Sequence, residues 1–328
     1  MMRILTAADV RQAVSMREAI DAVAAAFTQL STGHAVVPLR LPISQEAHHS
    51  HTFFMPALLA QSGGLGLKVV SVFPENGVRH GMPSIHAIVV LIEADTGRPA
   101  AVLDGTYLTA LRTGAASGAA TQALARPDSR VLAIFGAGAQ APHQVEAVCA
   151  VRPIERVLVV NRSRQRAEGL LATLAARGIA AEVAIAPSAA AALAVADVVC
   201  CATSAPTALF DDADLRPGTH INGVGSFTPH MAEVPVATIA RAHVVVDQRL
   251  AAWHESGDLV DARAAGVLDE SRVVELGEVI AGTAAGRTSA DQITFFKSVG
   301  NAVQDIAVGQ AALTHAQRLG LGVAVDLV

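Results

Sequence analysis

Residues 130–141 read RVLAIFGAGAQA, and this stretch decides the fold. The apolar run from Val131 to Phe135 predicts a short strand that is buried on both faces. The six residues after it fit the pattern G-x-G-x-x-A at a turn from strand into helix. Gly136 permits the tight turn, and Gly138 lets the backbone approach a pyrophosphate. The stretch therefore predicts a Rossmann domain that binds a dinucleotide.

The rest of this motif carries the helix and its phosphate contacts. Ala141 allows the helix to pack close to the sheet, and the turn residues Ala139 and Gln140 precede the helix N-terminus. Free N–H groups and the positive end of the helix dipole meet there, so a helix start of this kind receives phosphate groups. We expect Gly136, Gly138, Ala139 and Gln140 to contact the cofactor.

A second apolar strand, residues 157–160, ends at the distance where a Rossmann domain holds the ribose of the cofactor. Enzymes specific for NAD usually place an acid at this point, whereas this chain has Asn161, Arg162, Ser163 and Arg166. Guanidinium groups suit a 2′-phosphate, because they bind phosphate with charge-assisted hydrogen bonds. NADP(H) is therefore the preferred cofactor and NAD(H) a possible one; the alternative is a solvated basic helix start with no cofactor role.

The rhythm of the chain predicts an α/β fold with two domains. Short buried strands at residues 131–135, 157–160, 198–201 and 221–224 alternate with helical stretches, which indicates a doubly wound parallel sheet over residues 127–300. Before it, extended segments at residues 36–43, 51–54, 66–73, 85–92 and 99–103 predict a mostly antiparallel sheet. Helices are expected from the capping box Ser15–Glu18 to about Gly33, at residues 106–124 and at residues 301–319. Residues 1–126 and 301–328 together would form the second domain, into which the Rossmann domain is inserted.

Composition excludes several classes of protein. The chain has 328 residues, 52% of them hydrophobic, and a net charge of −5 without a basic block, which argues against nucleic acid as a partner. No apolar run reaches the roughly 20 residues of a membrane span, and the N-terminus has no signal-like apolar segment. The three cysteines, Cys149, Cys200 and Cys201, are an odd number and suit reduced core thiols. We expect a cytoplasmic protein.

Lysine is almost absent. Of 24 basic residues only Lys68 and Lys297 are lysines. An amine can be tuned to give up its proton near neutral pH, which a guanidinium cannot do, so a surviving lysine can mark a place where arginine fails. The other interpretation of Lys68, a leftover surface lysine, is equally consistent with composition alone.

Several segments together resemble the ornithine cyclodeaminase/mu-crystallin family over essentially the whole chain. These are LGLKVV (residues 65–70), PS (83–84), LDGTYLTALRTG (103–114), GAGAQ (136–140) and FKSVGNA (296–302). The resemblance implies a substrate and dimerisation domain built from both termini, an inserted Rossmann domain, and a homodimer. It also implies roles at matching positions: Arg40 and Arg112 would bind the substrate carboxylate, and Lys68 would be the active-site lysine. The implied cofactor contacts are Ser84, Arg112, Thr113, Asn161, Arg162, Thr203, Val224 and Ser298, and Lys297 would be structural, near the cofactor.

Two departures separate this chain from the cyclodeaminases of that family. Cyclodeaminases have a Glu just before the Met-Pro pair that corresponds to Met55-Pro56, where this chain has Phe53, and an Asp at the position of Phe227. Acids suit the distal amine of ornithine, whereas phenylalanine suits an apolar ring. The chain therefore resembles the ketimine reductase branch, and the expected reaction is reduction of Δ1-pyrroline-2-carboxylate or Δ1-piperideine-2-carboxylate to L-proline or L-pipecolate with NADPH. Alanine-dehydrogenase-like reductive amination, ornithine cyclodeamination and a non-catalytic ligand-binding role of the mu-crystallin type are the alternatives.

The role of Lys68 is left open between two possibilities. The alternation in the strand around it places Lys68 on the same face as Val70 and Val72. A partly desolvated amine could donate a proton to the imine nitrogen, or it could serve as a third ligand of the carboxylate. No metal is expected, because His48, His49 and His51 lack helical spacing and a neighbouring Cys or Asp ligand set.

Overall fold

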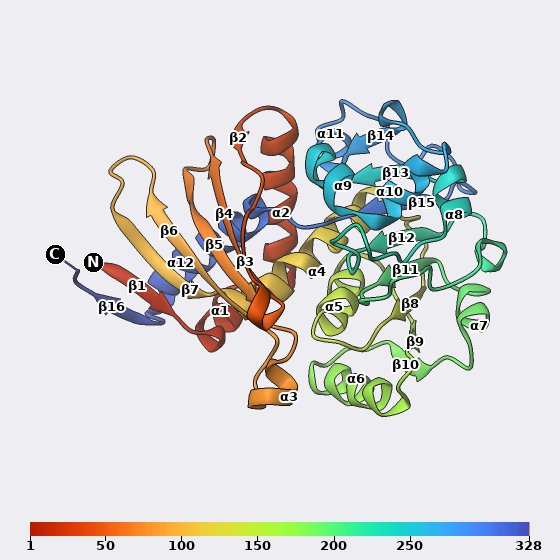
Figure 1. Cartoon of the computed structure of the whole chain (residues 1–328), viewed down its shortest axis with the longest axis horizontal. Helices are drawn as coiled ribbons and strands as arrows, with labels where there is room; N and C mark the ends of the chain where they lie inside the picture. The colour runs from red at the N-terminus through yellow and green to blue at the C-terminus, as the bar shows by residue number, and fades with distance from the viewer. Residues whose placement is uncertain (328) are drawn as a thin grey trace. The chain divides into compact units, whose positions relative to one another are not determined.

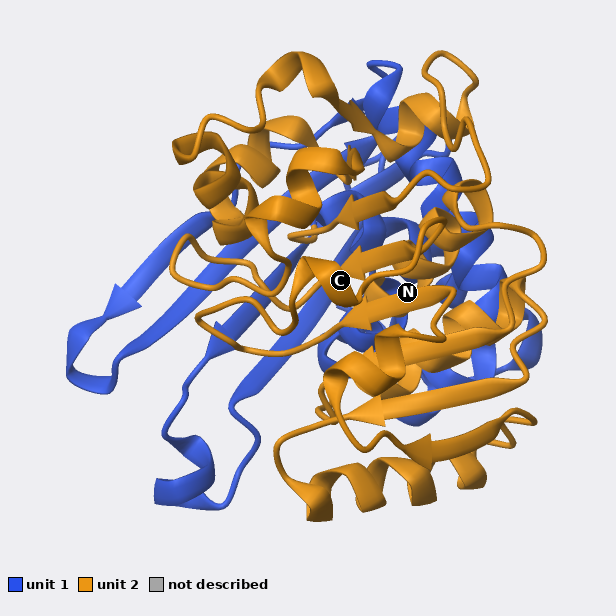
Figure 2. Cartoon of the chain, turned by 90° about the vertical axis from the view of Figure 1, so that its right-hand side faces the viewer, with its two compact units in different colours: residues 1–112, 301–328 blue, residues 113–300 orange. Residues whose placement is uncertain are grey.

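The computed structural model describes residues 1–327, and it divides the chain into two compact units. Unit 1 comprises residues 1–112 and 301–328, and unit 2 comprises residues 113–300 (Figure 2). The sequence suggested a boundary at residue 126, but the division falls inside helix α4 (Gly105–Leu124). The reason is packing: the missing side chain of Gly114 lets α4 approach the backbone of His143, and Asn222 donates a hydrogen bond to Thr121.

Unit 1 is built on an eight-stranded, mostly antiparallel sheet (Figure 1). Its strands are β1 (Met2–Leu5), β2 (Ala35–Val36), β3 (Leu41–Gln45), β4 (Ser50–Leu59), β5 (Gly64–Val72), β6 (Ile85–Glu93), β7 (Pro99–Asp104) and β16 (Val323–Val325), in the order β16-β1-β7-β6-β5-β4-β2 with β3 also paired to β4. The pair β1 and β7 is the parallel exception. Helices α1 (Ala7–Ala13), α2 (Met16–Ser31), α3 (Asn76–His80) and α12 (Ala302–Leu319) complete the unit with the start of α4.

The pairing register gives this sheet two different faces. One row across neighbouring strands is Leu5, Leu103, Val89, Lys68 and Met55, and every one of these side chains is buried. We call this the inner face. Helix α12 packs on it, and it comes close because Gly66 of β5 has no side chain; a Cβ there would lie 2.9 Å from Ile306 of α12. Lys68 is therefore the one charged member of an otherwise apolar, covered row.

The adjacent row forms the outer face. Its members in register are Ile4, Val102, Val90, Leu67 and Pro56, all of them apolar. On the same face Leu41, Ile43 and Ile88 are exposed. Unit 1 thus has one face that packs on its own helices and one apolar face with exposed side chains.

Most sequence-based elements of unit 1 are confirmed, with two corrections. The capping box opens α2, where Ser15 accepts from the N–H of Glu18 and the Glu18 carboxylate accepts from the N–H of Ser15. The extended segment expected at residues 36–43 is not continuous, because Pro38 cannot donate to a ladder and the chain leaves the sheet between β2 and β3. The terminal strands β1 and β16 were not predicted. They are only four and three residues long, too short to show a period.

Unit 2 is a doubly wound α/β domain, as predicted. All eight of its strands are parallel, in the order β10-β9-β8-β11-β12-β15-β13-β14. The strands are β8 (Val131–Phe135), β9 (Arg156–Val160), β10 (Glu182–Ile185), β11 (Val198–Cys201), β12 (His220–Gly223), β13 (His243–Val246), β14 (Val273–Glu275) and β15 (Thr294–Lys297). The first five repeat the Rossmann order 3-2-1-4-5, with the reversal of strand order between β8 and β11.

Helices cover both faces of this sheet. The helices are α5 (Ala141–Val151), α6 (Arg164–Ala176), α7 (Ala189–Leu193), α8 (Val236–Arg241), α9 (Arg249–Glu255), α10 (Gly257–Ala264) and α11 (Leu276–Ile280). One apolar cluster joins the sheet to α5 and α6, through Val145 and Leu170 among others, and a second joins it to α7, α8 and α10, through Leu193, Ile239 and Leu259. Because helices cover both faces, the central strands β8 and β11 are buried apolar runs.

Candidate functional site

A buried cluster of charges in unit 1 brings two of the predicted catalytic residues together. The Lys68 Nζ lies 2.8 Å from Oδ2 of Asp305, and the other oxygen of that carboxylate accepts a hydrogen bond of 3.0 Å from Nε of Arg112. Gln304 accepts a further hydrogen bond of 2.6 Å from Nη1 of Arg112. Asp305 thus binds both cations at once. We call Lys68, Arg112, Gln304 and Asp305 the cation cluster.

Asp305 and Gln304 were missed from the sequence. They lie in the first turn and a half of α12, where an acid is usually explained by the helix dipole. A signal was nevertheless present: residues one turn away, Ala302, Val308 and Gly309, are apolar, so this carboxylate faces the same covered side of the helix. A buried carboxylate requires a cation.

The third predicted cation, Arg40, lies in the segment between β2 and β3 and is half-buried. Its guanidinium carbon is 5.8 Å from the centre of the Phe53 ring, and its charge contributes to the field at Lys68. Phe53 pairs with Val70, and Met55 with Lys68, so the Phe53 ring shares the inner face with the Lys68 amine. Three cations and one aromatic ring therefore gather on this side of the sheet.

The environment of Lys68 weakens its hold on a proton. Burial, together with the positive charges of Arg112 and Arg40, lowers the pKa of Lys68 to about 7, against the raising effect of the Asp305 carboxylate. An amine with a pKa close to neutrality can both hold and release a proton under ordinary conditions. The cluster can therefore bind an anion and move a proton.

In unit 2 a cavity of about 410 Å³ opens at the carboxyl ends of β8, β9 and β11. Ligands of open parallel sheets bind at this edge, where the strand order reverses. The cavity is lined by Phe135, Gly136, Ala137, Gly138, Val160, Asn161, Arg162, Arg166 and the segment 202–209, which includes Thr203. Six of the residues predicted to contact the cofactor lie on its wall.

The two glycines of the motif fit a dinucleotide for different reasons. Gly136 has φ +102°, and a Cβ there would lie 2.5 Å from the carbonyl oxygen of Ala202, so only glycine fits this turn. Gly138 has no atom within 4 Å of an added Cβ, and it is exposed. The space that its side chain would fill is therefore open to a pyrophosphate. Ala139 and Gln140 follow in the same turn, directly before α5.

At the end of β9 the three arginines have different surroundings. Arg162 and Arg166 line the cavity, whereas Arg164 pairs with Glu168 on α6 at 2.9 Å. Asn161 donates to the carbonyl of Ser163, whose hydroxyl caps α6 by accepting from the N–H of Arg166. Among the residues that line the cavity there is no acid.

The remaining predicted cofactor contacts lie outside the wall of this cavity. Thr113 and Ser298 are buried, and the Ser298 hydroxyl donates to Asp247 at 2.7 Å. Val224 follows β12, and its N–H donates to the carbonyl of Cys201. Ser84 and Arg112 belong to unit 1, where the Ser84 hydroxyl lies 3.4 Å from the carbonyl of Pro74. Their contact with a cofactor stays a prediction.

Several other candidates have structural roles. Cys200 and Cys201 lie in β11, and burial raises the pKa of the Cys200 thiol to about 12, so these are core thiols as predicted. Within residues 1–327 no three His, Cys, Asp or Glu side chains are arranged to hold a metal ion. In the same residues no helix has both the length and the apolar character to cross a membrane.

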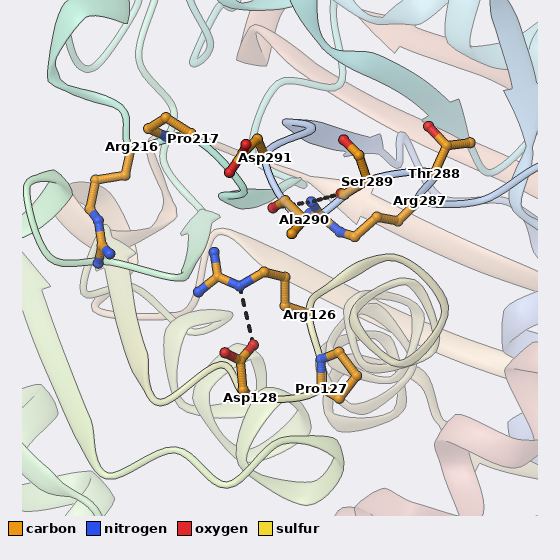
Figure 3. Close-up of a pocket in the computed structure, with 10 residues that line it drawn as sticks. All are labelled: Arg126, Pro127, Asp128, Arg216, Pro217, Arg287, Thr288, Ser289, Ala290 and Asp291. Carbon is orange, nitrogen blue, oxygen red and sulfur yellow. Dashed lines mark hydrogen bonds and ion pairs between the residues drawn. The ribbon is translucent and has the colours of Figure 1, made fainter.

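A larger cavity, of about 720 Å³, lies at the opposite edge of the unit 2 sheet (Figure 3). Arg126, Arg216 and Arg287 line it, and they lie just before β8, β12 and β15, at the amino ends of these strands. Two of the guanidinium groups are held within the chain: Arg126 pairs with Asp128 and Asp197, and Arg287 donates to the carbonyl of Leu124. We therefore assign no ligand to this cavity.

The glycine turn and the cavity beside it define unit 2 as a dinucleotide-binding domain. Unit 1 adds the cation cluster. The sequence matches the ornithine cyclodeaminase/mu-crystallin family over residues 1–317, and the chain belongs to this family. It is 38% identical over 327 residues to a Δ1-pyrroline-2-carboxylate reductase of Bacillus cereus, covering 99% of this chain and 100% of the relative.

Two solved structures are similar over the whole chain. One is Δ1-pyrroline-2-carboxylate reductase of Thermococcus litoralis in complex with NADH and L-proline, with a TM-score of 0.94, 39% identity, and coverage of 99% of this chain and 100% of that one. The other is an archaeal alanine dehydrogenase dimer with bound NAD, with a TM-score of 0.92, 34% identity, and coverage of 100% and 99%. The family and the class predicted from the sequence, an oxidoreductase with a Rossmann domain, are confirmed.

Proposed function

We propose that this protein reduces the C=N bond of cyclic imine carboxylates, Δ1-pyrroline-2-carboxylate and its six-membered homologue Δ1-piperideine-2-carboxylate, to L-proline and L-pipecolate, and that it prefers NADPH to NADH. The observation that carries the proposal is the cation cluster with Arg40 and Phe53 beside it. The similarity to reductases of Δ1-pyrroline-2-carboxylate supports the same substrate class. Three free thiols, two of them buried, suit the cytoplasm as its location.

The charges are suited to a carboxylate. Lys68, Arg112 and Arg40 supply three positive charges, and Asp305 compensates one of them. The excess of positive charge lies where burial strengthens electrostatic attraction. A substrate carboxylate restores the balance and is oriented by charge-assisted hydrogen bonds, which fixes the attached C=N carbon as well.

The apolar neighbour of this cluster suits a ring without a distal charge. Phe53 shares the inner face with Lys68, and an apolar ring that packs against it gives up no hydrogen bonds to water on binding. Phe227 lies in unit 2, in the loop after β12, and is partly exposed. Neither phenylalanine offers a carboxylate to an ammonium group, so ornithine is a poor substrate by this argument.

Lys68 is the proton donor in this proposal. The nicotinamide supplies a hydride to the imine carbon, and the nitrogen must gain one proton for the amine to form. The Lys68 ammonium gives up that proton, becomes a neutral amine and is protonated again from solvent. A pKa near neutrality makes the donation possible, and the Asp305 carboxylate helps to keep the donor protonated before the reaction.

The preference for NADPH rests on the end of β9. Arg162 and Arg166 on the wall of the unit 2 cavity would hold the 2′-phosphate, and the wall has no acid that would repel it. Gly136 and Gly138 would hold the pyrophosphate with the N-terminus of α5.

Substrate choice is tested by NADPH oxidation with Δ1-pyrroline-2-carboxylate, Δ1-piperideine-2-carboxylate, and pyruvate with ammonia, and by ammonia release from ornithine. We expect kcat/KM for the two imines to exceed that for pyruvate at least about tenfold, because the Phe53 ring packs against a ring and leaves a methyl group partly unpacked. Ornithine should release ammonia at under about a hundredth of the imine rate, since its ammonium would be unpaired. Faster turnover of pyruvate would identify an alanine dehydrogenase instead, and comparable ammonia release would show a cyclodeaminase.

Cofactor choice is tested by Arg162→Ala with Arg164→Ala as its matched control. Loss of a cavity-lining guanidinium should raise KM for NADPH about tenfold or more, the value of one charge-assisted contact, and change KM for NADH less than twofold. Arg164 pairs with Glu168 outside the cavity, so its removal should change neither KM more than twofold. Equal sensitivity of both cofactors to Arg162→Ala would contradict the role.

The donor role is tested by Lys68→Arg and by pH profiles. The guanidinium keeps the charge but cannot release a proton, so kcat should fall by a factor of about 100 or more. In the wild type, kcat/KM should decline above a pH of about 7, because the donor is then deprotonated. The corresponding decline of kcat should occur at higher pH, because the carboxylate of the bound substrate favours the charged form of the Lys68 amine.

The outcome that contradicts the donor role is equally specific. A Lys68→Arg enzyme with near-normal kcat, a raised KM for the imine and the same basic limb as the wild type would show that Lys68 is only a ligand of the carboxylate.

We further propose that two copies associate through the outer face of the unit 1 sheet. The register aligns apolar side chains across this face, and Leu41, Ile43 and Ile88 are exposed on it. Exposed apolar surface of this extent is typical of an interface. The dimer of the similar alanine dehydrogenase supports two copies as the assembly.

The interface is tested by Ile88→Glu, with Val78→Glu on α3 as control; both side chains are exposed, but only Ile88 lies on the outer face. A charge buried between two copies opposes association. Light scattering after size exclusion should give a dimer for the wild type and the control, and mostly monomer for Ile88→Glu. A dimer with unchanged dissociation constant in the Ile88→Glu variant would place the interface elsewhere.

A further inference from the structure

Glu233 of unit 2 was not predicted from the sequence as a functional residue. Its carboxylate joins two loops at the carboxyl edge of the sheet. It is fully buried. One oxygen accepts from the N–H and the hydroxyl of Thr203, at 2.7 and 2.8 Å. The other accepts from the N–H groups of Gly225 and Ser226, at 2.7 and 3.1 Å. Four donors therefore converge on one carboxylate.

The two loops that meet at Glu233 are those expected to surround the cofactor. Thr203 lies in the segment 202–209 on the wall of the 410 Å³ cavity, and Gly225–Ser226 lie between Val224 and Phe227. The packing is close: a Cβ at Gly225 would lie 2.4 Å from the Glu233 carboxylate and 2.1 Å from the Thr203 carbonyl oxygen. A shift of the carboxylate would therefore move both loops.

Asp258 and Lys297 hold Glu233 in turn. One Asp258 oxygen accepts from the N–H groups of Glu233 and Val234, at 2.6 and 3.0 Å. The other oxygen lies 2.9 Å from Nζ of Lys297, and neither side chain is exposed. The Lys297 charge also opposes the rise that burial causes in the pKa of Glu233. The Lys297 ammonium thus pairs with Asp258 and also acts electrostatically on Glu233.

A charged cluster that only stabilised the fold would not need to lie at the carboxyl edge of the sheet. Asp197 is also buried and accepts from Arg126 and from the N–H groups of Arg130 and Val131, but it lies at the amino edge of the same sheet. It provides a natural comparison: a buried carboxylate of the same domain that binds backbone N–H groups and a cation, and that does not line the dinucleotide cavity.

We propose that Glu233, held by Asp258 and Lys297, is a positioning residue for the dinucleotide: it sets the cavity wall at Thr203 and the loop that carries Phe227, without contacting the cofactor itself. The inference rests on the proposed nicotinamide dinucleotide but not on the proposed imine. It predicts that loss of the Glu233 carboxylate weakens cofactor binding because the two loops are displaced. The size of this effect should therefore depend on the hydrogen bond that Thr203 donates to Glu233.

The experiment measures the dissociation constant of NADPH by its fluorescence on the cofactor-free full chain, with no imine present, and the melting temperature of each variant. Glu233→Gln replaces an acceptor with an NH₂ group that faces the N–H groups of Gly225 and Ser226. Its Kd for NADPH should rise about tenfold or more, in line with the loss of hydrogen bonds to a charged group. Asp197→Asn should lower the melting temperature but change Kd less than twofold.

A double-mutant cycle separates positioning from direct contact. Thr203→Val removes the hydroxyl that donates to Glu233, and Thr203→Ser retains it, so the first should raise Kd more than the second. Thr203→Val should add less than twofold in the Glu233→Gln background. Full additivity there would overturn the proposal, because Thr203 would then act on the cofactor directly.

The companion variants address folding. If Glu233→Gln fails to fold, Lys297→Met tests the proposal instead. This variant leaves two buried carboxylates without their cation and should raise the Kd for NADPH about tenfold. Combining Lys297→Met with Asp258→Asn removes both charges of the pair and should bring the Kd back to within about threefold of the wild type. Kd values within twofold of the wild type for Glu233→Gln or Lys297→Met would overturn the proposal. A wild type that binds NADPH but reduces no imine would overturn the proposed substrate, while the Kd comparisons would still decide this inference.

Discussion

The Asp305 carboxylate lies between two buried cations, and the arrangement of unit 1 depends on that contact. An ion that leaves water costs several kcal/mol, and an unpaired partner left behind costs more. Lys68 is buried because its strand register places it in a row with Met55 and Val89, under α12. Arg112 arrives at the same point from α4. Without Asp305 the two cations would repel each other in a low dielectric; with it they lie side by side and still carry a net positive charge that a substrate carboxylate can neutralise.

Both lysines of this arginine-rich chain are fully buried and paired with an aspartate, Lys68 with Asp305 and Lys297 with Asp258. An ammonium is a compact point charge on a flexible stem, and a planar guanidinium with five donors would need more acceptors than either site offers. The two lysines nevertheless differ in what surrounds them. Lys68 lies near two further cations, which lower its pKa, whereas Lys297 lies near two carboxylates, Asp258 and Glu233. The first environment suits proton transfer and the second suits a fixed support.

Sequence reasoning recovered what short-range patterns determine. The strand and turn at residues 131–141 predicted the Rossmann unit, which the fold confirms. The family resemblance pointed to Lys68 and Arg112, which lie in one charged cluster, and the turn and the end of the next strand pointed to Gly136 and Arg162, which line one cavity; the roles of these residues stay predictions. It missed Asp305, Gln304, Glu233 and Asp258, because each has a partner that is remote in the chain: Asp305 meets Lys68 across 237 residues, and Glu233 meets Thr203 across 30. Only the fold shows that Arg164 pairs with Glu168 outside the cavity that Arg162 lines. The boundary inside α4 was beyond reach for the same reason, as the helix is continuous in sequence.

The same kind of contact occurs at both edges of the unit 2 sheet: a buried carboxylate accepts hydrogen bonds from backbone N–H groups of separate segments and so fixes the spacing of those segments. At the amino edge Asp197 fixes the entry of β8, in a region where strand starts and helix ends are tied together by arginines. At the carboxyl edge Glu233 fixes two loops that lead out of β11 and β12. The chemistry of the two carboxylates is the same, but parallel strands place all their outgoing loops, and with them the G-x-G-x-x-A turn, at the carboxyl edge. A small displacement at Asp197 is therefore absorbed by the fold, whereas the same displacement at Glu233 reaches the cavity wall. Position in the sheet, rather than the kind of side chain, makes one carboxylate a support for the core and the other a support for the site.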